Sequence, residues 1–218
     1  MKIRWLGHAC FGITSETGLK IITDPYEPGF RNIIGYGPVD ESADIVTVSH
    51  GHGDHNHVLS VSGNPVVVDT AGITTVRGTE FKGIATYHDR VKGAERGPNT
   101  IFLFRVDGIL LAHLGDLGHP LSSEQAGELA GVQVLLAPTG GPAATLELAE
   151  MIDLWEKLKP RIVIPMHFRT VKCSFPKYGT EDLLRLRPSA KIVGASEVSL
   201  ARDKLPVPTQ ILVLHPAR

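Results

Sequence analysis

The sequence predicts an α+β protein in which helices cover the outer faces of two mixed β-sheets. Up to Asp116, short apolar segments bounded by turn residues fill the chain, which is typical of β-structure. After Asp116, helical and strand patterns alternate. The 218 residues, 42% of them hydrophobic, are enough for one substantial core. Because the sequence has no long Pro/Ser-rich linker and no internal repeat, we expect one domain over residues 1–218.

The first half of the chain is predicted to be almost entirely β-structure. Three apolar-rich segments separated by turn residues are expected to form an antiparallel meander. Two later strands are expected to pair as a hairpin across Asp107-Gly108. The expected strands are Lys2–Leu6, Cys10–Thr14, Leu19–Thr23, Ile45–Val48, Pro65–Asp69, Phe81–Tyr87, Thr100–Val106 and Ile109–His113.

In the second half, helices are predicted between the strands. Ser122 and Gln125 have the Ser-x-x-Gln spacing of a capping box, so we expect a short helix that Gly131 can terminate. A longer helix is predicted over residues 144–158, because apolar residues recur at i, i+3 and i+4 and must lie against a sheet. The other expected elements are strands Val132–Ala137, Arg161–Ile164, Lys191–Gly194 and Gln210–Leu214 and a helix near Thr180–Arg185.

Charge, hydropathy and cysteine content limit the classes of binding partner and the cellular compartment that we expect. The net charge is −1 and the basic residues are scattered, so we expect no nucleic-acid partner. No segment approaches the roughly 18 consecutive apolar residues that cross a membrane. The N-terminal residues lack the pattern of a secretory signal, so we expect a cytoplasmic protein. Cys10 and Cys173 are far apart, and we expect both to be reduced and buried.

The most informative segment is residues 49–57, Ser-His-Gly-His-Gly-Asp-His-Asn-His. It follows a predicted strand, at the kind of strand end where open α/β folds bind ligands. Gly51 and Gly53 are expected to let the backbone fold tightly, so that side chains two and four residues apart converge. Nitrogen and oxygen ligands are typical of catalytic zinc-type sites, whereas structural sites are usually rich in cysteine. The segment therefore predicts a metal site rather than a solvated polar loop, with ligands His50, His52, Asp54 and His55.

A two-metal site needs further ligands and a group that bridges ions about 3.5–4 Å apart. The sequence offers candidates at three other strand ends. His88-Asp89 follows one predicted strand, His113 and Asp116 lie at the end of a second, and His167 lies at the end of a third. A rigid scaffold can aim an imidazole or a carboxylate from each of these positions.

The order of these motifs resembles the metallo-β-lactamase superfamily. The motifs are His50-x-His52-x-Asp54-His55, then His88, Gly115-Asp116 and His167. Asp24 resembles the early aspartate that supports the metal ligands in that superfamily. A compact subfamily of metal-dependent hydrolases, related to the ascorbate-6-phosphate lactonase group, is more similar still. That similarity extends over essentially the whole chain and is carried by Trp5–Phe11, Arg96–Phe102, His113–His119, Gly140-Gly141 and Pro165–His167.

The resemblance implies a four-layer αββα sandwich that holds two divalent metal ions at one edge, between the sheets. Three imidazoles suit zinc, and a site richer in carboxylate also accepts manganese or iron. The implied nucleophile is a hydroxide held between the metals, which Asp54 helps to orient. The implied ligands are His50, His52 and His88 for the first metal, Asp54, His55 and His167 for the second, and Asp116 for both.

Several polar residues outside this ligand set have open roles. His8, His113 and His119 are candidates for substrate binding, for proton donation or for supporting a ligand. We predict a catalytic role for His119, whereas the strand position of His113 favours a buried structural role. Asn99 either positions a substrate oxygen or caps a turn. His57 and His215 are expected to be ordinary surface residues.

The superfamily fold does not define a substrate, because one metal pair serves many hydrolytic reactions. The chain is short and its net charge is near zero, which favours a small-molecule substrate with a lactone or phosphodiester bond. A non-catalytic metal-binding or interaction protein is the alternative from another class, and a nuclease is less favoured. The resemblance is also compatible with a homo-oligomer.

Overall fold

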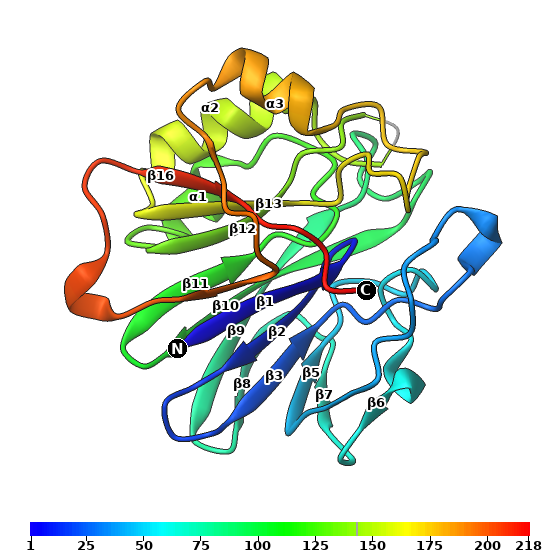
Figure 1. Ribbon diagram of the computed structural model, residues 1–218, viewed down its shortest axis with the longest axis vertical. Helices are drawn as coiled ribbons and strands as arrows, with labels where there is room; N and C mark the ends of the chain where they lie inside the picture. The colour runs from blue at the N-terminus through cyan, green and yellow to red at the C-terminus, as the bar shows by residue number, and fades with distance from the viewer. Residues whose placement is uncertain (143) are drawn as a thin grey trace.

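Two β-sheets pack face to face in the computed structural model, which describes residues 1–142 and 144–218 (Figure 1). The first sheet has the strand order β15-β1-β2-β3-β5-β7. The predicted antiparallel meander β1-β2-β3 is present, and β5 and β7 extend it in parallel. The strands of this six-stranded sheet are β1 (Lys2–Gly7), β2 (Cys10–Thr14), β3 (Lys20–Thr23), β5 (Ile45–Thr47), β7 (Val66–Val68) and β15 (Glu197–Ser199).

The second sheet has eight strands in the order β14-β16-β13-β12-β11-β10-β9-β8. β10 and β11 form the predicted hairpin. A separate short parallel pair joins β4 (Glu41–Ser42) to β6 (Val61–Ser62). The eight strands are β8 (Gly72–Val76), β9 (Thr79–Tyr87), β10 (Pro98–Val106), β11 (Ile109–His113), β12 (Val134–Pro138), β13 (Ile162–Met166), β14 (Lys191–Ile192) and β16 (Gln210–Val213).

The α-helices lie on the side of the eight-stranded sheet (Figure 1). They are α1 (Ser123–Glu128), α2 (Leu148–Leu158) and α3 (Thr180–Leu186). The predicted capping box is present, because Gln125 N–H donates to Ser122 Oγ and Ser122 N–H donates to Gln125 Oε1. Within the described ranges 1–142 and 144–218, no helix is long and apolar enough to cross a bilayer.

Helix α2 begins four residues later than predicted. The N–H of Leu146 donates to the carbonyl of Leu117 (2.9 Å), and the Thr145 hydroxyl donates to the carbonyl of Gly141 (3.1 Å). These bonds hold the chain in a turn before the helix, and Glu147 with Glu150 then forms its capping box. Apolar spacing alone does not reveal such a turn.

The main core lies between the two sheets. Ile21 and Ile45 point into it, whereas their neighbours Ile22 and Val46 belong to a second apolar cluster on the other face of the six-stranded sheet. Alternation along each strand thus supplies both clusters, and each fully buried side chain contributes about 1.5–3 kcal/mol. Residues 26–39 cover the second cluster, so irregular chain and short 3₁₀ turns, rather than an α-helix, form that outer layer. The 3₁₀ turns that contact this cluster are η1 (Phe30–Asn32) and η2 (Val58–Ser60), whereas η3 (Arg202–Lys204) precedes Leu205, which packs on the main core.

The strands that precede the predicted ligands run in a common direction within each sheet. β11, β12 and β13 are parallel, and β9 runs the same way because β10, antiparallel to both, separates it from β11. β3 and β5 are parallel in the other sheet. The carboxyl ends of β9, β11 and β13 therefore meet at one edge. They lie beside the ends of β3 and β5, since Oδ2 of Asp116 is 3.3 Å from Nε2 of His55 and Nδ1 of His113 is 4.0 Å from Oδ2 of Asp24.

Candidate metal centre

The loop that follows β5 carries the His/Asp motif and packs against residues 25–30. His55 N–H and Asn56 N–H donate to the carbonyl of His52 (2.9 and 3.0 Å), which turns the loop back on itself. A Cβ atom at Gly53 would lie 2.4 Å from Cε2 of Phe30. Gly53 therefore permits close packing against Phe30, and its φ does not lie in the left-handed region.

The first predicted ligand group is assembled from two loops. Ligand atoms of His50, His52 and His88 all lie within 4.8 Å of one another. His50 and His88 are buried, and His52 is half-buried. The strand end at Tyr87 thus delivers His88 to the motif on the opposite sheet, as the resemblance implies.

The second predicted group also forms, with one addition. Asp54, His55 and His167 converge, and His8 joins them, so that the ligand atoms of all four lie within 4.8 Å of one another. All four side chains are buried. Burial and the neighbouring His167 lower the pKa of His8 to about 3, which keeps its ring neutral. The sequence marked His8 as a residue of interest but did not assign it to this group.

Asp116 lies between the two groups. Its Oδ2 atom is 3.0 Å from Nε2 of His88, 3.2 Å from Nε2 of His167 and 3.3 Å from Nε2 of His55. The structure therefore brings together all seven residues predicted as ligands and places the expected bridging carboxylate at their centre.

Asn99 holds the backbone of Asp116 in place. Its Oδ1 accepts from Asp116 N–H (2.9 Å), while its Nδ2 donates to Thr86 Oγ1 (2.8 Å) and to the carbonyl of Leu114 (3.1 Å). The amide is buried and its hydrogen bonds are used within the protein. Of the two roles considered for Asn99, its contacts favour the structural one.

Asp24 controls the orientation of one ligand in each group. It is wholly buried, and its Oδ2 accepts from His55 Nδ1–H (2.8 Å) and from the hydroxyl of Ser49. Because that hydroxyl donates to Asp24, Ser49 Oγ accepts from His50 Nδ1–H (3.0 Å). Both imidazoles are thus fixed with the Nε2 lone pair free to bind a metal. Although burial acts to raise it, nearby His113 and His55 hold the pKa of Asp24 below its usual value.

Many buried polar atoms at this site have no hydrogen-bond partner among the described residues. A buried unpaired polar atom costs about 1–3 kcal/mol, so a cluster of them requires another partner. Imidazole nitrogens and carboxylate oxygens are the donor set that zinc, manganese and iron accept. The residues fit bound divalent metal. The unpaired atoms are Nε2 of His8, His50 and His55, Nδ1 of His88, both ring nitrogens of His167 and Oδ1 of Asp116.

A cavity of about 250 Å³ opens onto the cluster. The apolar residues Phe30, Ile33 and Phe175 line part of it, and the basic residues Arg31 and Arg96 line another part. In the described parts of the chain, neither arginine forms an ion pair with a carboxylate; other arginines do. His52, Asp54, His88, Asp116 and His167 form the rest of the lining together with Ala144.

The loop after His88 is folded around Asp89. The Asp89 carboxylate accepts four backbone N–H groups, from Val91 (2.9 Å), Gly93 (2.7 Å), Glu95 (3.0 Å) and Arg96 (2.8 Å). Desolvation acts to raise the pKa of Asp89, but these four hydrogen bonds outweigh it and lower the pKa to about 2. Asp89, a strand-end carboxylate noted in the sequence, therefore shapes the loop that carries Arg96 instead of joining the ligands.

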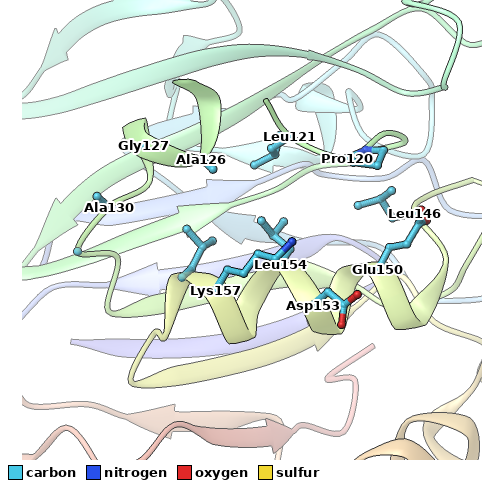
Figure 2. A pocket seen from close by; sticks show the side chains of 12 residues that line it. Pro120, Leu121, Ala126, Gly127, Ala130, Leu146, Glu150, Asp153, Leu154 and Lys157 are labelled. Atoms are coloured by element: carbon cyan, nitrogen blue, oxygen red, sulfur yellow. The ribbon is translucent and has the colours of Figure 1, made fainter. Parts of the chain in front are cut away.

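A larger hollow of about 590 Å³ lies between α1 and α2, away from the metal cluster (Figure 2). Leu121, Ala126 and Leu154 form part of its apolar lining, and Glu150 is one of its charged lining residues. None of its lining residues belongs to the metal-binding groups. The connection to the cluster is indirect, since Arg90 on the loop after His88 forms an ion pair with Glu150.

The remaining histidines stand apart from the cluster. His119 Nε2 accepts from Tyr87 N–H (3.1 Å), and its Nδ1–H donates to the carbonyl of Pro120 (2.9 Å), so both nitrogens hold backbone groups. The structure does not bring His119 to the ligands, and its contacts give no support to a catalytic role. His113 is buried and donates to the carbonyl of Ala9 (2.8 Å), as its strand position suggested. His215 is exposed, His57 is half-buried, and Cys10 and Cys173 are free and buried.

Comparison with known proteins identifies the family. The model of the β-lactamase superfamily domain matches residues 2–167. This chain belongs to the metallo-β-lactamase superfamily. A UPF0173 metal-dependent hydrolase of Archaeoglobus fulgidus is 30% identical over 200 residues, covering 78% of this chain and 84% of that relative. Another, of Pyrococcus furiosus, is 32% identical over 196 residues, covering 78% and 85%.

A solved structure with a higher identity is a candidate Zn-dependent hydrolase of the metallo-β-lactamase superfamily from Thermotoga maritima. It is 36% identical, has a TM-score of 0.79, and covers 98% of this chain and 97% of that chain. The metallo-β-lactamase fold predicted from the motifs is confirmed. With these relatives and the His/Asp cluster, this superfamily member is a metal-dependent hydrolase.

Proposed function

We propose that this metallo-β-lactamase superfamily member hydrolyses an ester-type bond, a lactone or a phosphodiester, in a small molecule with the help of two divalent metal ions. The observation that carries this proposal is the position of Asp116, whose Oδ2 lies 3.0–3.3 Å from imidazoles of both ligand groups. A single carboxylate between two groups of nitrogen and oxygen donors is the arrangement that a two-metal site requires. The cavity above it gives a substrate access.

Each group would hold one ion, and zinc is the metal we propose because imidazoles dominate both groups; manganese and iron are the alternatives. When bound, the metals would polarise the carbonyl or phosphoryl oxygen of the substrate and activate water for attack. Asp54 is placed to orient that water. Burial acts to raise its pKa, but contacts with His8 and His55 hold it below the usual value, so Asp54 stays ionised and accepts hydrogen bonds.

The walls of the cavity support a small anionic substrate. A volume of about 250 Å³ suits a metabolite, and the phenyl rings of Phe30 and Phe175 offer contact to an apolar or cyclic part. Arg31 and Arg96 offer the fork-shaped donors that suit a carboxylate or phosphate. With a net charge of −1 for the chain, we propose no nucleic-acid partner. His119 is left out of the chemical steps, because both its ring nitrogens are already used.

The test is a substrate screen with the metal-loaded protein. Lactones, bis-p-nitrophenyl phosphate and thioesters would be offered with zinc or manganese, and short RNA and DNA with the same metals. We expect turnover of at least one small ester and its loss in Asp116→Asn, which keeps the shape of the side chain but not its charge. Inactivity alongside stoichiometric metal would favour a binding protein, and cleavage of RNA or DNA would favour a nuclease.

A further inference from the structure

We propose that His8 is a direct metal ligand, which gives the second position four protein ligands besides the shared Asp116: His8, Asp54, His55 and His167. The inference rests on the metal site of the proposed function but goes beyond it. It adds a ligand and assigns different tasks to the two metal positions.

The ring of His8 faces the other three ligands. Its Nε2 atom is 3.3 Å from Oδ2 of Asp54, and its ring centroid is 4.0 Å from that of His167 and 5.0 Å from that of His55. Only about 1% of His8 is exposed, and its Nε2 has no hydrogen-bond partner among the described residues. Two atoms that bind one tetrahedral zinc at ~2.0–2.1 Å lie about 3.3–3.4 Å apart, which matches the distance from His8 to Asp54.

Hydrogen bonds and packing fix the backbone at His8 in a conformation that directs its ring toward the other three ligands. The carbonyl of His8 accepts from Trp5 Nε1–H (2.9 Å) and from His167 N–H (3.1 Å). His8 has φ 52°, in the left-handed region that L-residues with a Cβ seldom adopt. Gly7 before it has φ 134° and lies against Tyr36, whose Cγ would be 2.7 Å from an added Cβ. Such backbone conformations persist at functional sites, where surrounding contacts enforce them.

Four ligands besides the shared Asp116 change the character of the second position. Structural metal sites are closed by protein side chains, whereas catalytic sites keep one position open. The first position has only three imidazoles besides Asp116, those of His50, His52 and His88, and so has one protein ligand fewer. Both sets have members that line the cavity, but in the second set His8 and His55 are at most 1% exposed. The open coordination position is therefore assigned to the first metal.

A hydrogen bond from His8 to Asp54 is the competing explanation, and His8→Gln separates the two. Glutamine keeps an N–H donor for Asp54 but is a poor metal ligand. Metal content and zinc affinity would be measured by elemental analysis and chelator competition for the wild type, His8→Gln, His8→Ala and the exposed control His215→Ala. His52→Ala reports on the first position. These measurements do not require turnover, so they stand whether or not a substrate is found.

Loss of a residue that only supports a ligand costs about 10–100-fold in metal affinity. We expect the zinc affinity of the second position to fall by more than about 100-fold in both His8→Gln and His8→Ala, and the first position to be retained. His52→Ala should instead weaken the first position. The thermal midpoint of the metal-free variants should match that of the wild type, but its rise on adding zinc should shrink. A loss of about 100-fold or less in the zinc affinity of His8→Gln would make His8 a positioning residue and overturn the proposal. Zinc binding that is weakened by His52→Ala but by neither His8 variant would also overturn the proposal.

Discussion

Oδ2 of Asp24 lies 2.8 Å from Nδ1 of His55, and the same oxygen accepts from the Ser49 hydroxyl, which accepts in turn from His50. One buried carboxylate therefore fixes an imidazole in each metal-binding group. We expect Asp24→Asn to weaken both metals, by about 10–100-fold each, because an amide does not enforce either tautomer. Chelator competition with zinc gives the two affinities. A loss confined to one metal would contradict the shared role of Asp24.

Gly53 is predicted to be intolerant of a side chain. A Cβ there would lie 2.4 Å from the ring of Phe30, so Gly53→Ala must push the ring or the metal loop aside, at a cost of about 1–3 kcal/mol. Gly51→Ala is the matched control, since a Cβ at Gly51 meets no atom within 4 Å. Urea unfolding of the metal-free proteins measures both. Equal stability of the two variants would show that Phe30 yields without cost.

Asp89 should contribute stability that depends on pH. Its pKa is lowered from 3.8 to about 2 in the folded protein, so the contribution is present above about pH 4 and is lost as the pH falls towards 2. We expect Asp89→Asn to be less stable than the wild type at pH 7, and the gap to narrow below pH 4. Urea midpoints of the metal-free proteins at several pH values measure this gap.

The exposed Asp203 in η3 provides a control for Asp89, because Asp203→Asn should leave the midpoint unchanged at each pH. A gap between the wild type and Asp89→Asn that stays constant from pH 7 to pH 3 would mean that the carboxylate charge is not what holds the loop.

Arg31 and Arg96 should set the preference for charged substrates. Once an ester substrate is found, we expect Arg31→Met and Arg96→Met each to raise KM by about fivefold for an anionic ester, with little change in kcat. A neutral analogue should be unaffected. Arg105→Met is the control, since Arg105 donates to the carbonyl of Gly108 at the far end of the sheet. Equal effects on both esters would remove the anion preference.

Residues at strand ends explain how much of the site the sequence could predict. His88, Asp116 and His167 each follow an apolar strand, and a strand end fixes where a side chain emerges even when its partners are distant in the chain. His8 has no such local signal, because its ring reaches the cluster through the left-handed turn between β1 and β2. His119 shows the opposite case. Its place in the motif predicted a catalytic role, but both of its ring nitrogens form hydrogen bonds with backbone groups.

Most elements of the fold, like most of the metal ligands, could be predicted from the sequence. Sequence patterns located twelve of the sixteen strands in the described residues and all three α-helices, but not β4, β6, β8 and β15, which are very short or largely exposed. Residues 26–39 gave no periodic pattern, because irregular chain covers its sheet through single anchored contacts such as Tyr26 Oη–H to the carbonyl of Gly37 (2.9 Å). Tertiary contacts of this kind leave no trace in local sequence.

The common direction of β9, β11 and β13 sends His88, Asp116 and His167 to one edge and leaves tight turns such as Asp107-Gly108 at the other. Loops at the ligand edge can lengthen or change sequence without disturbing strand pairing, whereas the turns at the far edge connect paired strands directly. New specificities can therefore evolve at one edge while the other preserves the architecture, and a library aimed at a new substrate should be confined to the cavity-lining positions Phe30, Arg31, Ile33, Arg96 and Phe175.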